Sequence, residues 1–288
     1  MKSKRMKYLL AAVVVLVAVI TSCKLLEPKY TKADVTMAIT TSKSGKVSIW
    51  LEGSGTAIID WGDGSRKKYR ISKGNSRECS HIYNNSSPRT IAITGNNITY
   101  LGCYNIGLTN LDVSKNVQLT ELSCKDNQLT NLDVSSNLLL KSLRCEDNQL
   151  KYLNIGSNVH LERLHCWNNQ LTSLDLSGAT SLKWFECQRN RLTSLDVSKN
   201  IALIHFFCNN NLLISLDMSN NTELKNFGCS SNLLSSEALN SLFETLHGNT
   251  IVIGGGVAGK DIYVGNNPGT STADLSIAKE KGWTVYNW

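Results

Sequence analysis

The sequence predicts a mainly β protein whose central part is a solenoid, a chain wound into turns that stack on one another. Three observations support this class. Cysteine recurs every 21 residues from Cys103 to Cys229, apolar residues recur around it with the same period, and each period divides into two halves with the same apolar spacing. A fixed period of this length is the signature of repeat proteins, in which each unit buries its apolar side against the next.

The first 22 residues predict an export signal that is not part of the fold. The basic stretch KSKRMK precedes an unbroken apolar run over residues 9–20, which is too short to span a bilayer. The next residues, ITSC, resemble the lipobox of bacterial lipoproteins. That resemblance implies that Cys23 is lipidated, becomes the mature N-terminus and is the chain's membrane contact; a plain secretory signal that happens to precede a cysteine is the alternative. Residues 23–35 are then a linker.

The charge of the exported chain does not favour nucleic acid as a partner. The whole chain has a formal net charge of +7, and residues 1–22 contain four basic residues and no acid, so their removal leaves +3. So small a surplus is no strong attraction for a polyanion. An exported protein would also rarely meet nucleic acid.

Residues 36–97 predict a small β-sandwich. The segments VTMAIT, KVSIWLEG, AIIDWGDGS, KKYRIS and RTIAITG alternate apolar and polar residues and are separated by Gly, Ser, Asn and Lys, a pattern typical of short strands joined by turns. The stretch IDWGDGS at 59–65, followed by HIY at 81–83 and then TIAITG, resembles the PKD-type immunoglobulin-like sandwich. The segment is short for that family, so we expect a strand to be missing or shared with the first repeat.

Polar residues in this segment have two interpretations. Asp60, Asp63 and His81 could bind calcium or another ligand. Alternatively, Asp63-Gly64 is a tight turn and Trp61 is a core anchor, so that these residues only shape the fold. We favour the turn and core interpretation.

Residues 98–233 contain the repeats. Each unit reads L-x-x-L-x-C-x-x-N-x-L-x-x-L-D-V-S-x-N-x-x, with a degenerate first copy at Ile98 and six clear copies that start at Leu119, Leu140, Leu161, Leu182, Leu203 and Leu224. In both halves apolar residues alternate with polar ones, as in a strand buried on one face, and we expect two short strands per turn. Asparagine is expected to make the bend after each strand, because its side chain bonds the backbone and it tolerates left-handed conformations.

The unit resembles a known family. L-x-x-L-x-C-x-x-N-x-L is similar to the core signature of leucine-rich repeats, and the nested 21-residue form resembles the bacterial class called IRREKO repeats. The chain also resembles the BspA-like surface proteins. The resemblance covers about 135 residues. It implies a solenoid used for protein–protein contact and adhesion, and it does not identify the partner.

The cysteine ladder is interpreted as packing. The other half-repeat fills the equivalent position with aliphatic residues, namely Val113, Val134, Ile155, Leu176, Val197 and Met218. A position that accepts either residue type is an interior one, where free cysteine behaves as a small hydrophobe. Stacked side chains point the same way, which is poor geometry for a disulfide, and no C-x-x-C pair suggests a metal site. Some disulfide, or metal or redox chemistry, remains the alternative, and Cys79 has no evident partner.

The period fails in residues 234–288, which predict a C-terminal cap. SSEALNSLFETLHG has serine caps and helical apolar spacing, so we expect a helix from about Ser236 to His247. The stretches NTIVIGG, DIYVGN and WTVYNW predict strands, and STADLSIAKEKG predicts a second helix. A solenoid must close its open apolar end, and these elements would do so.

Comparing the copies with one another locates a candidate binding surface. On the L-D-V half the outward positions are nearly constant, as a uniform scaffold requires; the repeated aspartate is expected to bond the backbone rather than to form a calcium ladder. On the L-x-C half the outward residues vary from copy to copy and include aromatic and basic residues, the types enriched in interface hot spots. The predicted partner-binding residues are Arg144, Arg163, His165, Trp167, Trp184, Glu186, His205 and Phe207.

These observations predict a non-enzymatic envelope lipoprotein that binds a protein. No nucleophile is paired with a base by spacing, and the chain has no H-E-x-x-H motif and no glycine-rich phosphate loop after a strand. No cofactor and no metal are predicted. The alternatives are a glycan-binding protein and a purely structural envelope component. We expect an outer-membrane lipoprotein on the cell surface, with a periplasm-facing orientation as the alternative.

Overall fold

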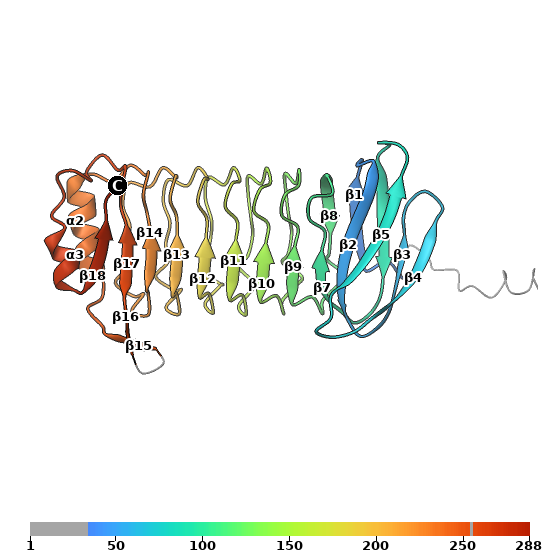
Figure 1. The fold of residues 1–288 in the computed structure, drawn as a ribbon, viewed down its shortest axis with the longest axis horizontal. Coiled ribbons are helices and arrows are strands. Elements are labelled where there is room, and N and C mark those ends of the chain that lie inside the picture. The colour runs from blue at the N-terminus through green and yellow to red at the C-terminus, as the bar shows by residue number, and fades with distance from the viewer. Residues whose placement is uncertain (1–33, 254–255) are drawn as a thin grey trace, which may run out of the picture. The chain divides into compact units, whose positions relative to one another are not determined.

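The computed structural model describes residues 34–253 and 256–288. The predicted export signal, Cys23 and the linker up to residue 33 lie outside the described residues. Residues 36–288 form one compact unit. It is built on a five-stranded and an eleven-stranded sheet, with a two-stranded ribbon near the C-terminus (Figure 1). In the part of the chain that the structure describes, no helix is long and apolar enough to cross a membrane.

Six antiparallel strands precede the repeats. Along them buried residues alternate with more exposed ones, so each strand has one face in the core. Strands β4, β3, β6 and β1 pair in the five-stranded sheet, and β5 and β2 lie at one end of the eleven-stranded sheet. The strands are β1 (Met37–Thr41), β2 (Gly45–Gly53), β3 (Gly55–Asp60), β4 (Arg66–Ile71), β5 (Arg77–Tyr83) and β6 (Arg89–Thr94).

The first repeat joins both sheets. Its strand β7 (Ile98–Gly102) pairs antiparallel with β2 and parallel with the next repeat, whereas β8 (Leu108–Asp112) pairs antiparallel with β1. This is the sharing of a strand that the short length of residues 36–97 led us to expect. The buried apolar residues form one cluster from Met37 to Trp283, so the core is continuous across the predicted boundary at residue 97. The PKD-like resemblance of this segment stays a prediction.

The L-x-C halves build a parallel ladder, which confirms the predicted solenoid. Each strand has three residues and pairs in register with the same positions one repeat further on. The ladder continues past each strand, because the amide of each cysteine donates to the next turn, as Cys145 does to His165. The strands are β9 (Glu121–Ser123), β10 (Ser142–Arg144), β11 (Arg163–His165), β12 (Trp184–Glu186), β13 (His205–Phe207) and β14 (Asn226–Gly228).

The L-D-V half differs from the prediction, because it forms no second ladder. Beyond β8 its described residues contain a single isolated bridge, between Asp133 and Asn154. Local bonds occupy its backbone groups instead. The Asp133 carboxylate accepts the amide of Ser135 at 2.9 Å, and the Val134 carbonyl accepts the amide of Asn137 at 3.0 Å. These backbone groups therefore do not serve a strand ladder.

The asparagine after each L-x-C strand bonds the backbone as predicted, but it does not adopt the left-handed conformation. It is the preceding residue that adopts the left-handed conformation, as Asp147 does with a φ of 54° and Asn168 with a φ of 53°. The asparagine itself is buried and bonds the backbone of two turns. The side-chain amide of Asn148 donates to the carbonyls of Cys124, Cys145 and Glu146 at 3.0–3.2 Å, and its oxygen accepts the Leu129 amide at 3.0 Å.

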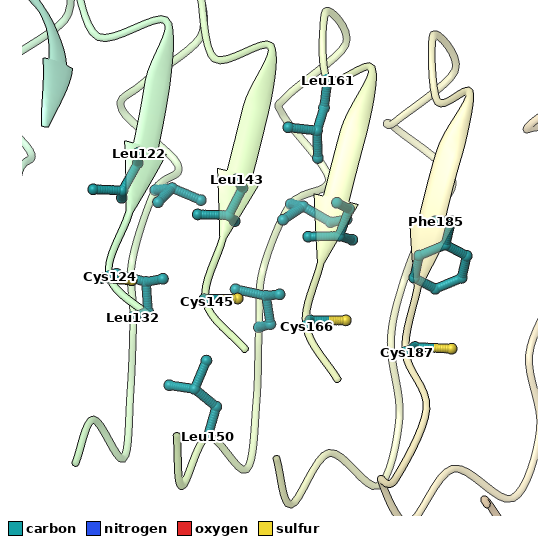
Figure 2. Packing of buried hydrophobic residues seen from close by; sticks show 14 of the residues in the cluster. Leu122, Cys124, Leu132, Leu143, Cys145, Leu150, Leu161, Cys166, Phe185 and Cys187 are labelled. Atoms are coloured by element: carbon teal, nitrogen blue, oxygen red, sulfur yellow. The ribbon is translucent and has the colours of Figure 1, made fainter. Parts of the chain in front are cut away.

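The cysteines line the interior, as predicted. All eight described cysteines are free and buried. Figure 2 shows Cys124, Cys145, Cys166 and Cys187 in one row, one per turn, beside apolar residues such as Leu143 and Phe185. Burial raises the pKa of Cys103 to about 12 and the pKa of Cys145 well above its usual value, so the thiols stay protonated and unreactive.

We therefore expect a chain with Cys23 replaced by serine to show almost no thiol reaction while folded. Titration with a chromogenic disulfide reagent at pH 8 should release the reagent's thiolate only after a denaturant is added, since the folded protein holds almost no thiolate. The unfolded chain should then react at all eight remaining positions. Prompt reaction of several thiols in the folded protein would show that the ladder is open to solvent.

The C-terminal segment extends the ladder, and its two helices lie at that end of the sheet (Figure 1). The predicted helix near 236–247 is observed as α2 (Ser236–Thr245), where Ser235 accepts the Ala238 amide at 3.2 Å and Leu239, Leu242 and Phe243 are buried. Two further parallel strands follow, β17 (Lys260–Tyr263) and β18 (Trp283–Tyr286). The other elements are the ribbon β15 (Ile251–Ile253) with β16 (Gly256–Ala258), and the short helix α3 (Ser276–Glu280).

Candidate binding face

The parallel register arranges the outward side chains of the L-x-C half in three columns. Column one holds the first residue of each strand, column two holds the third, and column three holds the residue after the cysteine. We call the surface formed by these columns the L-x-C face. Because the interior positions barely change, the backbone presents different side chains at the same spacing on each turn.

Glu186 is the centre of a side-chain cluster on this face. Its Oε1 accepts the indole N–H of Trp184 at 2.6 Å, and its Oε2 lies 3.1 Å from Nδ1 of His165. Burial raises the pKa of Glu186, but the contacts with His165 and Trp184 outweigh it and hold that pKa below its usual value. The carboxylate therefore stays charged and fixes both neighbouring rings.

His205 extends this cluster to the next turn. Its ring lies 4.1 Å from the Trp184 ring, centroid to centroid, and its Nδ1 lies 2.9 Å from the side-chain amide nitrogen of Asn226. Burial, and then the positive charge of Lys225, lower the pKa of His205. A neutral ring that accepts the Asn226 amide is consistent with this shift. Trp184, Glu186, His165 and His205 thus form one preorganised group.

The remaining predicted residues border this group. The Phe207 ring lies directly against Gly228. A Cβ atom added to this glycine would be only 2.7 Å from Phe207 Cδ1, which is closer than van der Waals contact. Trp167 is half-buried in column three, and Arg163 is exposed next to Trp184 in column one. Among the described residues, Arg163 makes no ion pair, so its charge is open to a partner.

Arg144 lies apart from the aromatic group. It is exposed and forms an ion pair with Glu146, Nη2 to Oε1, at 2.6 Å. Glu146 follows Cys145 and so belongs to column three, an outward position, but it is fully buried. Ser123, Ser142 and Gly228 are likewise buried. An outward position in a column therefore does not by itself expose a side chain, and at Gly228 the neighbouring Phe207 ring covers the position.

The sequence pattern did not predict three aromatic residues of this face, because they follow the last repeat. The register places Tyr263 and Tyr286 in column two, after Phe207 and Gly228. The two tyrosine rings stack at 4.7 Å, and the ring of Trp288, which is 79% exposed, lies 4.9 Å from Tyr286. Alignment of DIYV with the apolar spacing of the repeats could have found Tyr263, because Ile262 takes the interior position of Phe227.

The acidic residues between β3 and β4, Asp60 and Asp63, have structural partners. Asp63 accepts the Ser65 hydroxyl at 2.6 Å and the Ser65 amide at 3.0 Å, and it lies 2.7 Å from Nε2 of His81. These contacts, the Ser65 hydroxyl first, lower the pKa of Asp63 to about 2. Asp60 accepts from Gly62 and forms an ion pair with Arg66 at 2.9 Å. Trp61 is only 1% exposed. These contacts are those of a turn next to the core.

No metal centre is formed by the residues that the structure describes, in which no three His, Cys, Asp or Glu side chains gather. The repeated aspartates of the L-D-V half each accept the amide two residues on, for example Asp196 from Ser198 at 2.8 Å. The bonds from Ser198 lower the pKa of Asp196. The expected bonding of these aspartates to the backbone is therefore what the structure has.

The comparison with known proteins gives the class of the fold. No protein-family model matches the sequence, and no curated protein matches it. The structure is similar to internalin C2 from Listeria monocytogenes, with a TM-score of 0.52 and 21% identity over 65% of this chain and 80% of that chain. The protein is thus a leucine-rich-repeat solenoid.

Two other solved structures are similar over comparable parts of the chain. The functional domain of InlJ from Listeria monocytogenes, described as including a cysteine ladder, has a TM-score of 0.37 and 22% identity over 70% of this chain. Only 56% of that domain's length is matched. The leucine-rich-repeat domain of a Shigella effector has a TM-score of 0.48 and 23% identity over 66% of this chain and 81% of that chain.

Proposed function

We propose that the protein is a non-enzymatic cell-envelope lipoprotein that binds a protein partner through the L-x-C face. One observation carries the proposal: a uniform interior supports an outer surface that changes on every turn and concentrates aromatic and charged side chains on β11 to β13. The leucine-rich-repeat fold is commonly a protein-binding scaffold, and the internal packing leaves little freedom to the residues that would meet a partner.

The proposed contact centre is the Trp184 group. Glu186, His165 and His205 already hold the indole ring, so a partner would not have to order it. Rigid aromatic side chains give large contact areas at low entropic cost, and such residues dominate interface energies. Arg163 and the aromatic residues Phe207, Tyr263, Tyr286 and Trp288 would surround this centre.

The proposed membrane anchor is inferred from the N-terminal sequence. A lipidated Cys23 would hold the chain at the outer membrane and residues 36–97 would hold the repeats away from the lipid. We favour the cell surface over the periplasm, because a binding face needs access to partners. Protease treatment of intact cells distinguishes the two orientations, since only a surface protein is cleaved without breaking the cell.

We expect the double variant Trp167→Ala, Trp184→Ala to lose partner binding while it keeps its fold. A partner is first identified by affinity capture from host and bacterial extracts, and its affinity for the purified protein is then measured. Loss of two hot-spot aromatics should weaken binding by at least about a hundredfold, or 3 kcal/mol. The melting temperature should change little, because both side chains lie outside the interior cluster.

Tyr152→Ala is the matched control for this variant. Tyr152 is an aromatic residue with 72% exposure that lies on the L-D-V half, away from the L-x-C face. It should bind the partner as tightly as the unchanged protein does. Retained binding by the double variant, or equal losses in both variants, would exclude the L-x-C face as the contact surface.

A further inference from the structure

The L-x-C face contains a second feature, a hollow over its N-terminal turns. Strands β2, β7, β9 and β10 lie in this order in the sheet (Figure 1). Their register pairs Gly102 with Ser123 in column two, and Ser142 lies in column one of the next strand. Larger residues surround them and leave a pocket of about 490 Å³. The equivalent positions on β12 and β13 hold large aromatic and charged residues, so the hollow is specific to these turns.

Two serine hydroxyls of this pocket have no protein partner. Ser123 and Ser142 line the pocket and are each only 7% exposed. Among the described residues, neither Oγ atom has a hydrogen-bond partner, and neither is an enclosed atom, so both are accessible from the pocket. Two such hydroxyls at the base of an open pocket are placed to bond a polar ligand.

Tyrosine rings form a wall of the pocket. The Tyr100 side chain lies over Gly102. A Cβ atom added to this glycine would be only 2.5 Å from the Tyr100 hydroxyl oxygen. Burial raises the pKa of Tyr100 to about 12, so its hydroxyl keeps its proton and remains a donor. Tyr104 also lines the pocket. Such rings offer an apolar face beside a polar group.

The charges around the pocket disfavour an anion. Glu52 and Glu121 line it with no ion-pair partner among the described side chains, and they would repel an anion. Lys125 and Arg144 also line the pocket, but each is already paired with an acid, Asp126 at 3.4 Å and Glu146 at 2.6 Å, so neither is free to hold an anion. The groups left free are hydroxyls and carboxylates, which bond the hydroxyl groups of a neutral ligand.

We propose that this pocket binds a neutral saccharide unit. Sugar hydroxyls would bond Ser123, Ser142, Tyr100 and the two carboxylates, and the apolar C–H face of the ring would lie on tyrosine. The volume is within the range of small-ligand sites. The site stands independently of the proposed protein contact, because its residues lie on β2, β7, β9 and β10 or directly beside them, whereas the aromatic group lies on β11 to β13.

The test is a binding measurement with the full chain and a panel of neutral sugars. Glucose, galactose, mannose, N-acetylglucosamine and their β-linked disaccharides are titrated at millimolar concentrations and followed by calorimetry and saturation-transfer NMR. We expect at least one to bind. Glu121→Ala, a change at an exposed residue, should weaken the affinity for that sugar at least tenfold. Ser142→Trp should abolish sugar binding, because the indole ring would fill the hollow. Column one already holds a tryptophan two strands further on, at Trp184, so the strand can accept this residue.

Matched controls separate this site from the rest of the face. Glu223→Ala, at an exposed glutamate outside the pocket, and Trp184→Ala should both bind the sugar normally. The proposal is overturned if no sugar of the panel binds, if Glu121→Ala and Ser142→Trp bind as well as the unchanged protein, or if a basic or acidic peptide occupies the pocket instead. Loss of partner binding in Trp184→Ala with sugar binding intact would confirm that the two sites are separate.

Discussion

Replacement of Phe206 by alanine is expected to lower the free energy of unfolding by about 4 kcal/mol, as is usual for a buried phenylalanine. Phe206 is 0% exposed, and its ring lies 5.3 Å from both Phe185 and Phe227 in the interior. Removal of the middle ring leaves a cavity between two turns that the parallel ladder holds at fixed spacing. Urea denaturation followed by circular dichroism measures the loss from the midpoint and slope.

Two variants test the cause of this loss. Phe206→Leu installs the residue that earlier copies have at this position, such as Leu143 and Leu164, and should cost only about 1 kcal/mol. Phe207→Ala changes the same residue type one position further on, where the ring faces outward, and should leave stability within about 1 kcal/mol. A similar loss at 206 and 207 would contradict the assignment of interior and outer positions.

Replacement of Asn148 by alanine is expected to lower the free energy of unfolding by about 3 kcal/mol. The side chain is 8% exposed and bonds three carbonyls and one amide, which come from two turns. Alanine leaves these backbone groups buried without their partner, and each such group costs about 1–3 kcal/mol unless water replaces the bond. Chemical denaturation again gives the value.

Asn131→Ala is the control, because Asn131 is exposed and has no side-chain bond among the described residues. It should be nearly neutral. Asn148→Asp should be at least as harmful as the alanine change, since a carboxylate would face the carbonyl oxygens that the amide now bonds. If Asn148→Ala unfolded at the same urea concentration as Asn131→Ala, the asparagine would not connect the turns.

Both experiments probe how the scaffold supports the binding face. Interior rings, thiols and asparagine amides repeat with little change, and they set the spacing and direction of every strand from β9 to β14. Variation on the outer columns therefore does not disturb the fold. This separation explains how Trp184, Glu186 and the two histidines can form one fixed cluster on a structure that stays regular.

Much of the architecture could be predicted because it is local or repeated. The period of 21 gives the solenoid, the exchange of cysteine with aliphatic residues gives the interior thiols, and serine caps with helical spacing give α2. The same reasoning found the variable columns and most of the aromatic cluster. Sequence patterns succeed here because identical residues in identical surroundings repeat the same packing.

Other features depended on contacts between distant segments. The left-handed residue before each asparagine bonds the next turn, as the Asp147 amide does with the Trp167 carbonyl. Glu146 is buried where it pairs with Arg144. Tyr263, Tyr286 and Trp288 join the face only because β17 and β18 continue the parallel register. The hollow at Ser123 and Ser142 likewise needs β2 and β7 beside the first clear repeat.

By itself the sequence determined that the chain is a repeat solenoid with a cysteine-lined interior and one variable outer face, because period and alternation directly record which positions are buried. Only the tertiary structure decided which outward residues meet, which are covered, and where the face is hollow. Those properties depend on the register between strands and on the sizes of neighbouring side chains, and neither is contained in any single repeat.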